Sequence, residues 1–355
     1  MAGVTGSGTG EVREGMRFDA ARLEAWLRQE VPGLRGPFAV EQFRGGQSNP
    51  TYKLAGPDGA YVLRRKPPGK LLPGAHAVDR EYRVLAALGA EGFPVPRVHG
   101  LCLDEDVIGT PFYVMDLVDG RIFWDTTFPE VRREERPLYF DAMNATIARL
   151  HSIDPEAVGL GDYGRPGNYF ERQIARWSKQ YLGDVEAGRV PAMDRLVEWL
   201  PAHIPPGAGD ESRIIHGDFR CDNMIFHPAE SKVAAVLDWE LSTLGHPLAD
   251  FTYHLMVYRM PAGVATGLAG RDLAALNIPS EDEYVAAYCR RTGRDGIPDI
   301  DFYMAFNMFR LAAIVHGIKG RLARGSASSA EAGRMASRLE PLADLAWAQA
   351  LRAPA

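Results

Sequence analysis

Between two short apolar runs the sequence reads Ile214-Ile215-His216-Gly217-Asp218-Phe219-Arg220-Cys221-Asp222-Asn223-Met224-Ile225-Phe226. Apolar residues lead into and out of a dense polar segment, a pattern typical of a loop between two buried strands. Within this segment His216, Asp218 and Asn223 have the spacing H-x-D-x-x-x-x-N. A further short apolar run ends at Asp238, which places another carboxylate at the end of the next predicted strand. The region therefore predicts a polar loop and a strand end rich in oxygen ligands.

The spacing of these polar residues is that of a kinase catalytic loop, where positioning and charge neutralisation carry phosphoryl transfer. We predict that Asp218 takes the proton of an acceptor hydroxyl, and that Asn223 and Asp238 bind Mg²⁺, which prefers oxygen ligands. Arg220 is a candidate contact for the γ-phosphate, although a solvated loop arginine is the alternative. Because polar loops also carry Asp and Asn for turns alone, the hypothesis needs support from elsewhere in the chain.

The first third of the chain supplies candidate phosphate contacts. Arg64, in a strand-like run, is a cation suited to the α- and β-phosphates, with Arg65 or Lys66 as competitors. Glu81, in a predicted helix, is the expected partner of Arg64. Small and polar residues between two strand-like runs could let backbone N–H groups approach phosphate; these are Gly45, Gly46, Gln47, Ser48 and Asn49.

A strand-like run over residues 112–118 resembles a connection between two lobes. The backbone of Asp116 and Val118 would read the edge of an adenine there, and Met115 would border its pocket. Together with the phosphate contacts, this run predicts ATP and Mg²⁺ as the nucleotide and the metal.

The composition is that of an ordinary globular chain of 355 residues, with 46% hydrophobic and 24% charged residues. A formal net charge of −6 argues against nucleic acid or an anionic membrane as the partner. Three widely spaced cysteines without a CxxC pair favour a reducing, cytoplasmic location over a disulfide scaffold or zinc site. No apolar run approaches about 18 residues, so no membrane span is predicted.

The order of the predicted elements favours an α+β protein with a two-lobed, protein-kinase-like fold. We predict a disordered leader over residues 1–15, a small β-rich, nucleotide-binding N-lobe over residues 16–117, and a larger, mainly helical C-lobe over residues 118–355 with catalytic and substrate-binding residues. Expected strands cover residues 38–43, 51–54, 61–65, 107–108 and 112–118, with more strand between 214 and 241. Expected helices cover residues 18–31, 78–88, 137–151, 169–182, 193–203, 281–292, 302–324 and 330–351.

From residue 38 to about 345, the chain resembles the aminoglycoside phosphotransferase family of kinase-like enzymes. The segments that carry the resemblance are Arg149-Leu150-His151, Ile215-His216-Gly217-Asp218, Asn223, Leu237-Asp238-Trp239-Glu240 and Pro247-Leu248-Ala249-Asp250. It implies Asp218 as the catalytic base and Asn223 and Asp238 as magnesium ligands. It also implies that Asp250 is a buried carboxylate bracing the catalytic loop.

Residues 62–82 and 309–314 resemble one branch more closely, namely the kinase domain fused to acyl-CoA dehydrogenases of types 10 and 11 and its bacterial relatives. This branch implies phosphorylation of a hydroxyl group on a hydroxyacyl-CoA, with an acyl-CoA dehydrogenase as partner in the same pathway. Basic residues that would then meet the CoA phosphates are Lys66, Lys70, His76, Arg310, Lys319 and Arg321. A solvated basic loop and an ordinary helix face are the alternative.

The sequence also departs from protein kinases. Gly217 stands where they have the arginine of H-R-D, and Glu240 where they have the glycine of D-F-G. Because that arginine senses an activation-loop phosphate, its absence favours a constitutive metabolite kinase. Two alternatives remain open, a phosphotransferase for an aminoglycoside, macrolide or other small alcohol, and a nucleotide-binding pseudokinase.

Overall fold

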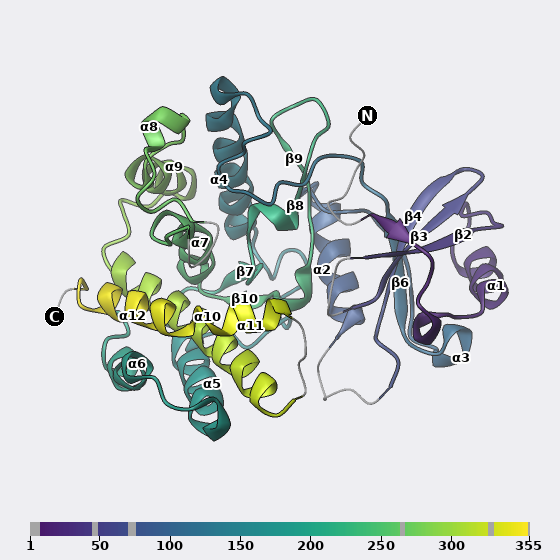
Figure 1. Cartoon of the computed structure of the whole chain (residues 1–355). Helices are drawn as coiled ribbons and strands as arrows, with labels where there is room; N and C mark the ends of the chain where they lie inside the picture. Colours follow the sequence, from purple (N-terminus) through teal and green to yellow (C-terminus); the bar gives the residue numbers. More distant parts are fainter. Residues whose placement is uncertain (1–7, 45–48, 70–75, 263–266, 326–329, 354–355) are drawn as a thin grey trace. The chain divides into compact units, whose positions relative to one another are not determined.

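A computed structural model describes residues 8–44, 49–69, 76–262, 267–325 and 330–353 (Figure 1). Its contacts divide the chain into two units that alternate along the sequence. Unit 1 comprises Met1–Asp125, Glu156–Tyr163 and Arg220–Ser242, and unit 2 comprises Thr126–Pro155, Gly164–Phe219 and Thr243–Ala355. The chain passes from unit 2 to unit 1 between Phe219 and Arg220, inside the predicted catalytic loop. The predicted lobe boundary after residue 117 stays a prediction.

Unit 1 is built on a six-stranded sheet whose neighbouring strands are all antiparallel. The strand order is β1 (Thr9–Gly10), β2 (Ala39–Phe43), β3 (Thr51–Gly56), β4 (Gly59–Arg65), β6 (Phe112–Asp116) and β5 (Val98–Cys102). Because side chains alternate across a strand, the sheet has two different faces.

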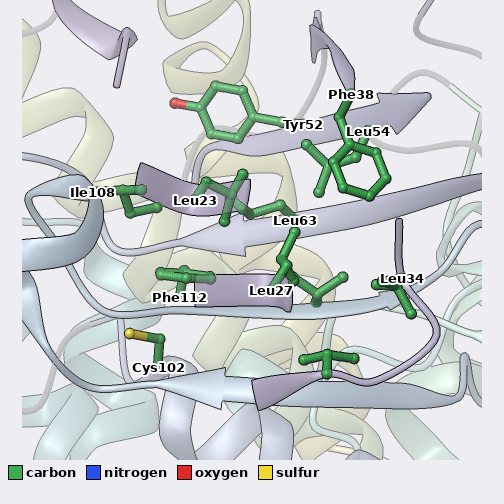
Figure 2. Close-up of a cluster of buried hydrophobic side chains, with 12 residues drawn as sticks. Leu23, Leu27, Leu34, Phe38, Tyr52, Leu54, Leu63, Cys102, Ile108 and Phe112 are labelled. Atoms are coloured by element: carbon green, nitrogen blue, oxygen red, sulfur yellow. The ribbon is translucent and has the colours of Figure 1, made fainter. Parts of the chain in front are cut away.

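One face of the sheet carries the apolar core of unit 1 (Figure 2). Helix α1 (Ala20–Glu30) begins after its N-cap residue Asp19, whose side chain accepts from the N–H groups of Ala21 and Arg22. The helix buries Leu23 and Leu27 in one cluster with sheet side chains that include Leu63. Burial of this kind contributes about 1.5–3 kcal/mol for each large side chain.

The opposite face of the sheet carries Arg64 and Tyr113 and is contacted by helix α2 (Val78–Ala90). Unit 1 also holds an antiparallel hairpin of β8 (Met224–Phe226) and β9 (Val233–Val236). The 3-10 turn η5 (Trp239–Leu241) follows β9 and contacts α2. Helix α2 is therefore placed between the sheet and the segment that follows Asp238.

Three expectations for unit 1 are wrong. The strand expected at residues 107–108 is helix α3 (Glu105–Ile108), because Asp104 accepts from the N–H of Asp106 and Gly109 ends the turn with φ +88°. Strand β5 was not expected. The predicted disorder of residues 1–15 does not hold at Thr9–Gly10, which pair with β2, while residues 1–7 lie outside the described part of the chain.

Unit 2 is mainly helical. Its longer helices are α4 (Arg136–Ser152), α5 (Tyr169–Gly183), α6 (Pro191–Ala202), α7 (Pro247–Leu255), α9 (Glu281–Thr292), α10 (Ile300–Ala323) and α12 (Leu339–Ala350). Helix α10 contacts α5, α6, α7 and α12 and is apolar on nearly all sides, as a central helix must be (Figure 1). The short strands β7 (Arg213–Ile215) and β10 (Thr243–Gly245) pair antiparallel and flank the catalytic loop in sequence. Within the described residues, no helix is long and apolar enough to cross a membrane.

The helix expected over residues 330–351 is two helices, α11 (Ala330–Ala336) and α12. The cause is Pro341, which lacks an N–H group and would clash with the carbonyl of Ser337 in a continuous helix. A new helix that begins at Leu339 places this proline in its first turn, where it is tolerated.

Candidate active site

Arg64 is the centre of a charged cluster in unit 1. Its Nε lies 2.7 Å from Glu81 Oε2, and its Nη2 donates to Asp238 Oδ1 at 2.8 Å. Glu240 lies 3.8 Å from the same Nη2. Burial acts to lower the pKa of Arg64, but Glu81, Tyr113 and the other carboxylates outweigh it and raise this pKa. The expected pair of Arg64 and Glu81 is present, and three carboxylates share one guanidinium.

Glu81 lies in the first turn of α2 and is only 2% exposed. Its carboxylate accepts from Asn49 Nδ2 at 2.6 Å and from the Tyr113 hydroxyl at 3.0 Å. Burial raises the pKa of Glu81, while Arg64 opposes the rise. The side chain of Asn49 is thus directed to Glu81 and also to His76, whose Nδ1 lies 3.0 Å from Asn49 Oδ1. Gly45, Gly46, Gln47 and Ser48, the other predicted loop contacts, lie outside the described residues.

The β8–β9 hairpin brings Asn223 and Asp238 to one end. Asn223 directly precedes β8, and its carbonyl accepts from the N–H of Leu237 at 2.8 Å. Because the strands are antiparallel, the start of β8 and the end of β9 lie together. Asp238 has φ +63°, a left-handed conformation that is uncommon for a residue with a side chain and is typical of strained functional positions.

Asn223 and Asp238 supply one amide and one carboxylate oxygen, a donor set that fits Mg²⁺ when phosphate oxygens and water complete its shell. Among the described residues, no group of three His, Cys, Asp or Glu side chains could hold a metal by itself. Arg220, the other predicted loop residue in unit 1, lies 3.3 Å from Asp222 and has a half-exposed side chain.

A cavity of about 200 Å³ lies in unit 1 beside this cluster. Arg64 and Asp238 line it, and so do Met115, Asp116 and Val118, the three residues predicted to border an adenine. The sequence analysis missed its other apolar lining residues, which include Val62, Leu85, Pro96, Ile122, Ile225 and Val236. Of these residues Val62, Ile225 and Val236 lie in strands. Strand alternation indicates which face each of them occupies, but not that two separate sheets would enclose one cavity.

In unit 2, the backbone around Asp218 is fixed by Asp250, as the family resemblance implied. Asp250 Oδ2 accepts from the N–H of His216 at 2.8 Å, and its Oδ1 accepts from the N–H of Gly217 at 2.7 Å. His151 Nε2 lies 3.2 Å from Oδ2. Burial acts to raise the pKa of Asp250, yet His151 and the backbone donor of His216 lower it overall. Gly217 has φ +83°, which favours glycine where protein kinases have arginine.

Two residues of unit 2 were missed or misassigned from the sequence. The Tyr253 hydroxyl donates to Asp218 Oδ1 at 2.5 Å. Arg310 was expected to meet CoA phosphates, but it is 8% exposed and its Nη2 donates to the carbonyl of Gly217 at 2.8 Å. Tyr253 follows Asp250 by one helical turn, a signal that the helix boundary of α7 would have revealed.

The geometry can be set beside known proteins. The model of a family described as "Phosphotransferase enzyme family" matches residues 39–306. Acyl-CoA dehydrogenase family member 11 of Gallus gallus is 45% identical over 345 residues, which cover 95% of this chain and 44% of that protein. The chain thus spans less than half the length of this relative. Family member 10 of Mus musculus is also similar, at 43% identity.

Solved structures of phosphotransferases are also similar to this chain. A Ralstonia eutropha JMP134 protein with the provisional name aminoglycoside phosphotransferase has a TM-score of 0.89 and 50% identity, covering 96% of this chain and all of that one. Spectinomycin phosphotransferase, solved with ADP and spectinomycin, has a TM-score of 0.62 over 93% of this chain and 98% of that one. At 12% identity it shows the kinase-like fold alone. The chain belongs to the phosphotransferase enzyme family, and the predicted fold and the resemblance to types 10 and 11 are confirmed.

Proposed function

We propose that the protein transfers the γ-phosphoryl group of Mg-ATP to a hydroxyl group of a hydroxyacyl-CoA. The observation that carries the proposal is Arg64, held between Glu81 and Asp238 at a cavity bordered by residues 115–118. Such a cation suits the nucleotide phosphates, and the apolar lining suits a base. The ADP in the related spectinomycin phosphotransferase supports an adenine nucleotide.

In the proposed reaction the acceptor oxygen bonds to the γ-phosphorus while the bond from that phosphorus to the leaving ADP oxygen breaks. Asp218 takes the proton that the acceptor hydroxyl loses, and Asp250 fixes the backbone of the loop that carries this residue. Asn223 and Asp238 would hold Mg²⁺, which neutralises phosphate charge when bound. Arg64 would contact the phosphates, and Arg220 is proposed for the γ-phosphate.

The acceptor class rests on the relatives at 43–45% identity, whose names place them among acyl-CoA dehydrogenases. Lys66, His76, Lys319 and Arg321 are the proposed contacts for CoA phosphates, and Lys70 lies outside the described residues. A dehydrogenase would then act on the product in the same pathway. An aminoglycoside or another small alcohol is the second candidate, favoured by the provisional name of the Ralstonia protein.

A substrate screen tests the proposal. The protein is incubated with Mg-ATP and hydroxyacyl-CoA thioesters of several chain lengths, and separately with aminoglycosides, macrolides and simple alcohols. Mass spectrometry should show ADP and a thioester that has gained one phosphoryl group. Turnover of drugs or alcohols alone would move the assignment to the second candidate, and ATP binding without any transfer would indicate a pseudokinase.

Two variants separate the assigned roles. We expect Asp218→Asn to lower kcat by at least about 10²-fold with little change in the Kd of Mg-ATP, because only the base is lost. We expect Asp238→Ala instead to weaken Mg-ATP binding, because a metal ligand is lost. Equal effects of both variants on binding and rate would contradict this division of roles.

A further inference from the structure

We propose that Tyr253 is a positioning residue that sets the orientation of the Asp218 carboxylate. The inference rests on the proposed function, in which Asp218 receives the proton of the acceptor. Its basis is the hydrogen bond from the Tyr253 hydroxyl to Asp218 Oδ1, at 2.5 Å. A hydroxyl that donates to an ionised carboxylate makes a short, strong bond, and this distance lies in that range.

The loop backbone by itself does not orient this carboxylate. Asp250 holds the N–H groups of His216 and Gly217, and the N–H of Asp218 donates to His216 Nδ1 at 3.1 Å. These bonds involve the main chain and not the carboxylate oxygens of Asp218. The Tyr253 hydroxyl donates to one of those oxygens and so restricts the side-chain torsions of Asp218.

Helix α7 carries both residues that hold the catalytic loop, Asp250 and Tyr253. Asp250 and Tyr253 are three residues apart, so they lie on the same side of the helix. Asp250 is in the first turn and holds the backbone of the loop, and Tyr253 is one turn further and holds its side chain. The helix thus acts on the loop twice, and a shift of α7 would move both contacts together.

The ring of Tyr253 is itself held in place. The guanidinium carbon of Arg310, from helix α10, lies 5.3 Å from the ring centroid, within the range of a cation–π contact. The same guanidinium donates to the carbonyl of Gly217 at 2.8 Å. Arg310 is 8% exposed, so this cation is fixed inside unit 2. Arg310 therefore contacts both the Tyr253 ring and the loop backbone.

Unit 2 offers a matched control for the hydroxyl. The Tyr181 hydroxyl donates to Asp194 Oδ1, also at 2.5 Å. Asp194 belongs to helix α6 and has no assigned role in the reaction. Tyr253→Phe and Tyr181→Phe thus each remove one tyrosine–aspartate hydrogen bond of the same length, and Tyr181→Phe also removes the bonds of that hydroxyl with the backbone of Val190. Only the first bond involves the proposed base.

The experiment measures kcat, the KM and Kd of Mg-ATP, and Tm for wild type, Tyr253→Phe, Tyr181→Phe, Asp218→Asn and the double variant Tyr253→Phe/Asp218→Asn. We expect Tyr253→Phe to lower kcat by about 10- to 10²-fold, since a small misplacement of a reacting group has this effect. The KM and Kd of Mg-ATP should stay at wild-type values. In the Asp218→Asn background, the loss of Tyr253 should cost no more than about twofold, because residues that act through each other are not additive.

Each outcome decides the assignment. A kcat for Tyr253→Phe equal to that of Tyr181→Phe, with wild-type turnover intact and the kcat of Asp218→Asn lower by at least about 10²-fold, would overturn the role of Tyr253 and leave the proposed function standing. Additive losses in the double variant would also overturn it, because Tyr253 would then act independently of Asp218. Failure of wild type to phosphorylate any acceptor would overturn the proposed function, and the positioning role with it.

Discussion

Each unit holds one deeply buried carboxylate beside a predicted active residue, and the two behave in opposite ways. Glu81 in unit 1 is 2% exposed and Asp250 in unit 2 is 1% exposed. Burial acts to raise the pKa of both groups, but the pKa of Glu81 is raised overall and that of Asp250 is lowered overall. Burial alone therefore does not decide the charge of a carboxylate in this protein.

The difference comes from the partners. Asp250 accepts hydrogen bonds from the backbone N–H groups of His216 and Gly217, and His151 Nε2 lies 3.2 Å from its Oδ2. Glu81 shares Arg64 with Asp238, and this second carboxylate adds to the rise in the Glu81 pKa. Backbone N–H donors suit a loop that must stay still, whereas crowded carboxylates suit the proposed metal site.

Of the substitutions that test this difference, Asp250→Asn should have the largest effect on stability. The new amide keeps the shape but turns one acceptor into a donor that faces backbone N–H groups. Each lost charge-assisted bond costs about 1.5–3 kcal/mol, so we expect a loss of at least about 3 kcal/mol in the free energy of unfolding. Urea denaturation measures this loss, and a wild-type midpoint would show that the loop does not depend on the carboxylate.

Two buried histidines of unit 2, His246 and His254, should make the stability of the protein depend on pH. Burial lowers the pKa of each from 6.5 to about 4. The unfolded chain then binds more protons than the folded one between these values, so their contribution is complete above about pH 6.5 and is lost as pH falls toward 4. The slope should be about 1.4 kcal/mol per pH unit for each histidine.

Urea denaturation between about pH 7 and 4.5 tests this slope. The variants His246→Asn and His254→Asn should each remove about half of the histidine contribution, whatever their cost at neutral pH. An unchanged slope in both variants would mean that other groups cause the acid sensitivity.

For unit 1, Glu81→Gln should raise the Kd of Mg-ATP about tenfold, because Arg64 loses the charged partner that sets its position. The change costs less stability than Asp250→Asn, since the amide oxygen still accepts from Asn49 or Tyr113. Calorimetry measures the Kd. The matched control is Asp162→Asn, which removes an exposed carboxylate paired with Arg83 of the same helix and should leave the Kd unchanged.

The smallest expected effect is at Tyr163, which ties helix α2 to the segment after Asp238. Its hydroxyl lies 2.7 Å from Ser242 Oγ and donates to the carbonyl of Arg80 at 3.2 Å, while the Arg80 guanidinium lies 4.2 Å from its ring. Tyr163→Phe keeps the ring contact and should cost about 1 kcal/mol of stability and raise the Kd of Mg-ATP a few-fold. Tyr52→Phe is the control: it removes a hydrogen bond from the Tyr52 hydroxyl to the carbonyl of Met16. It should lower stability and leave the Kd of Mg-ATP unchanged.

The sequence indicated those features that follow from short spacings. Asp218 and Asn223 belong to one loop, Asp238 follows the next strand, and Arg64 and Glu81 lie on strand β4 and helix α2, which are consecutive elements of the chain. Tyr253 and Arg310 were not found or were misassigned, because their roles depend on how α7 and α10 pack against the loop. Asn49 was predicted from its place in a glycine-rich turn, but the direction of its side chain depends on α2.

The contact between Arg64 and Asp238 would make metal binding at the proposed nucleotide site a competition between two cations, Arg64 and Mg²⁺. A guanidinium stays protonated at every physiological pH, so this competitor cannot be removed by titration. A magnesium ion that arrives alone must displace Arg64 from Asp238, whereas one that arrives with phosphates brings Arg64 new anionic partners. We therefore expect the empty site to bind free Mg²⁺ poorly and to accept metal and nucleotide as a single ligand.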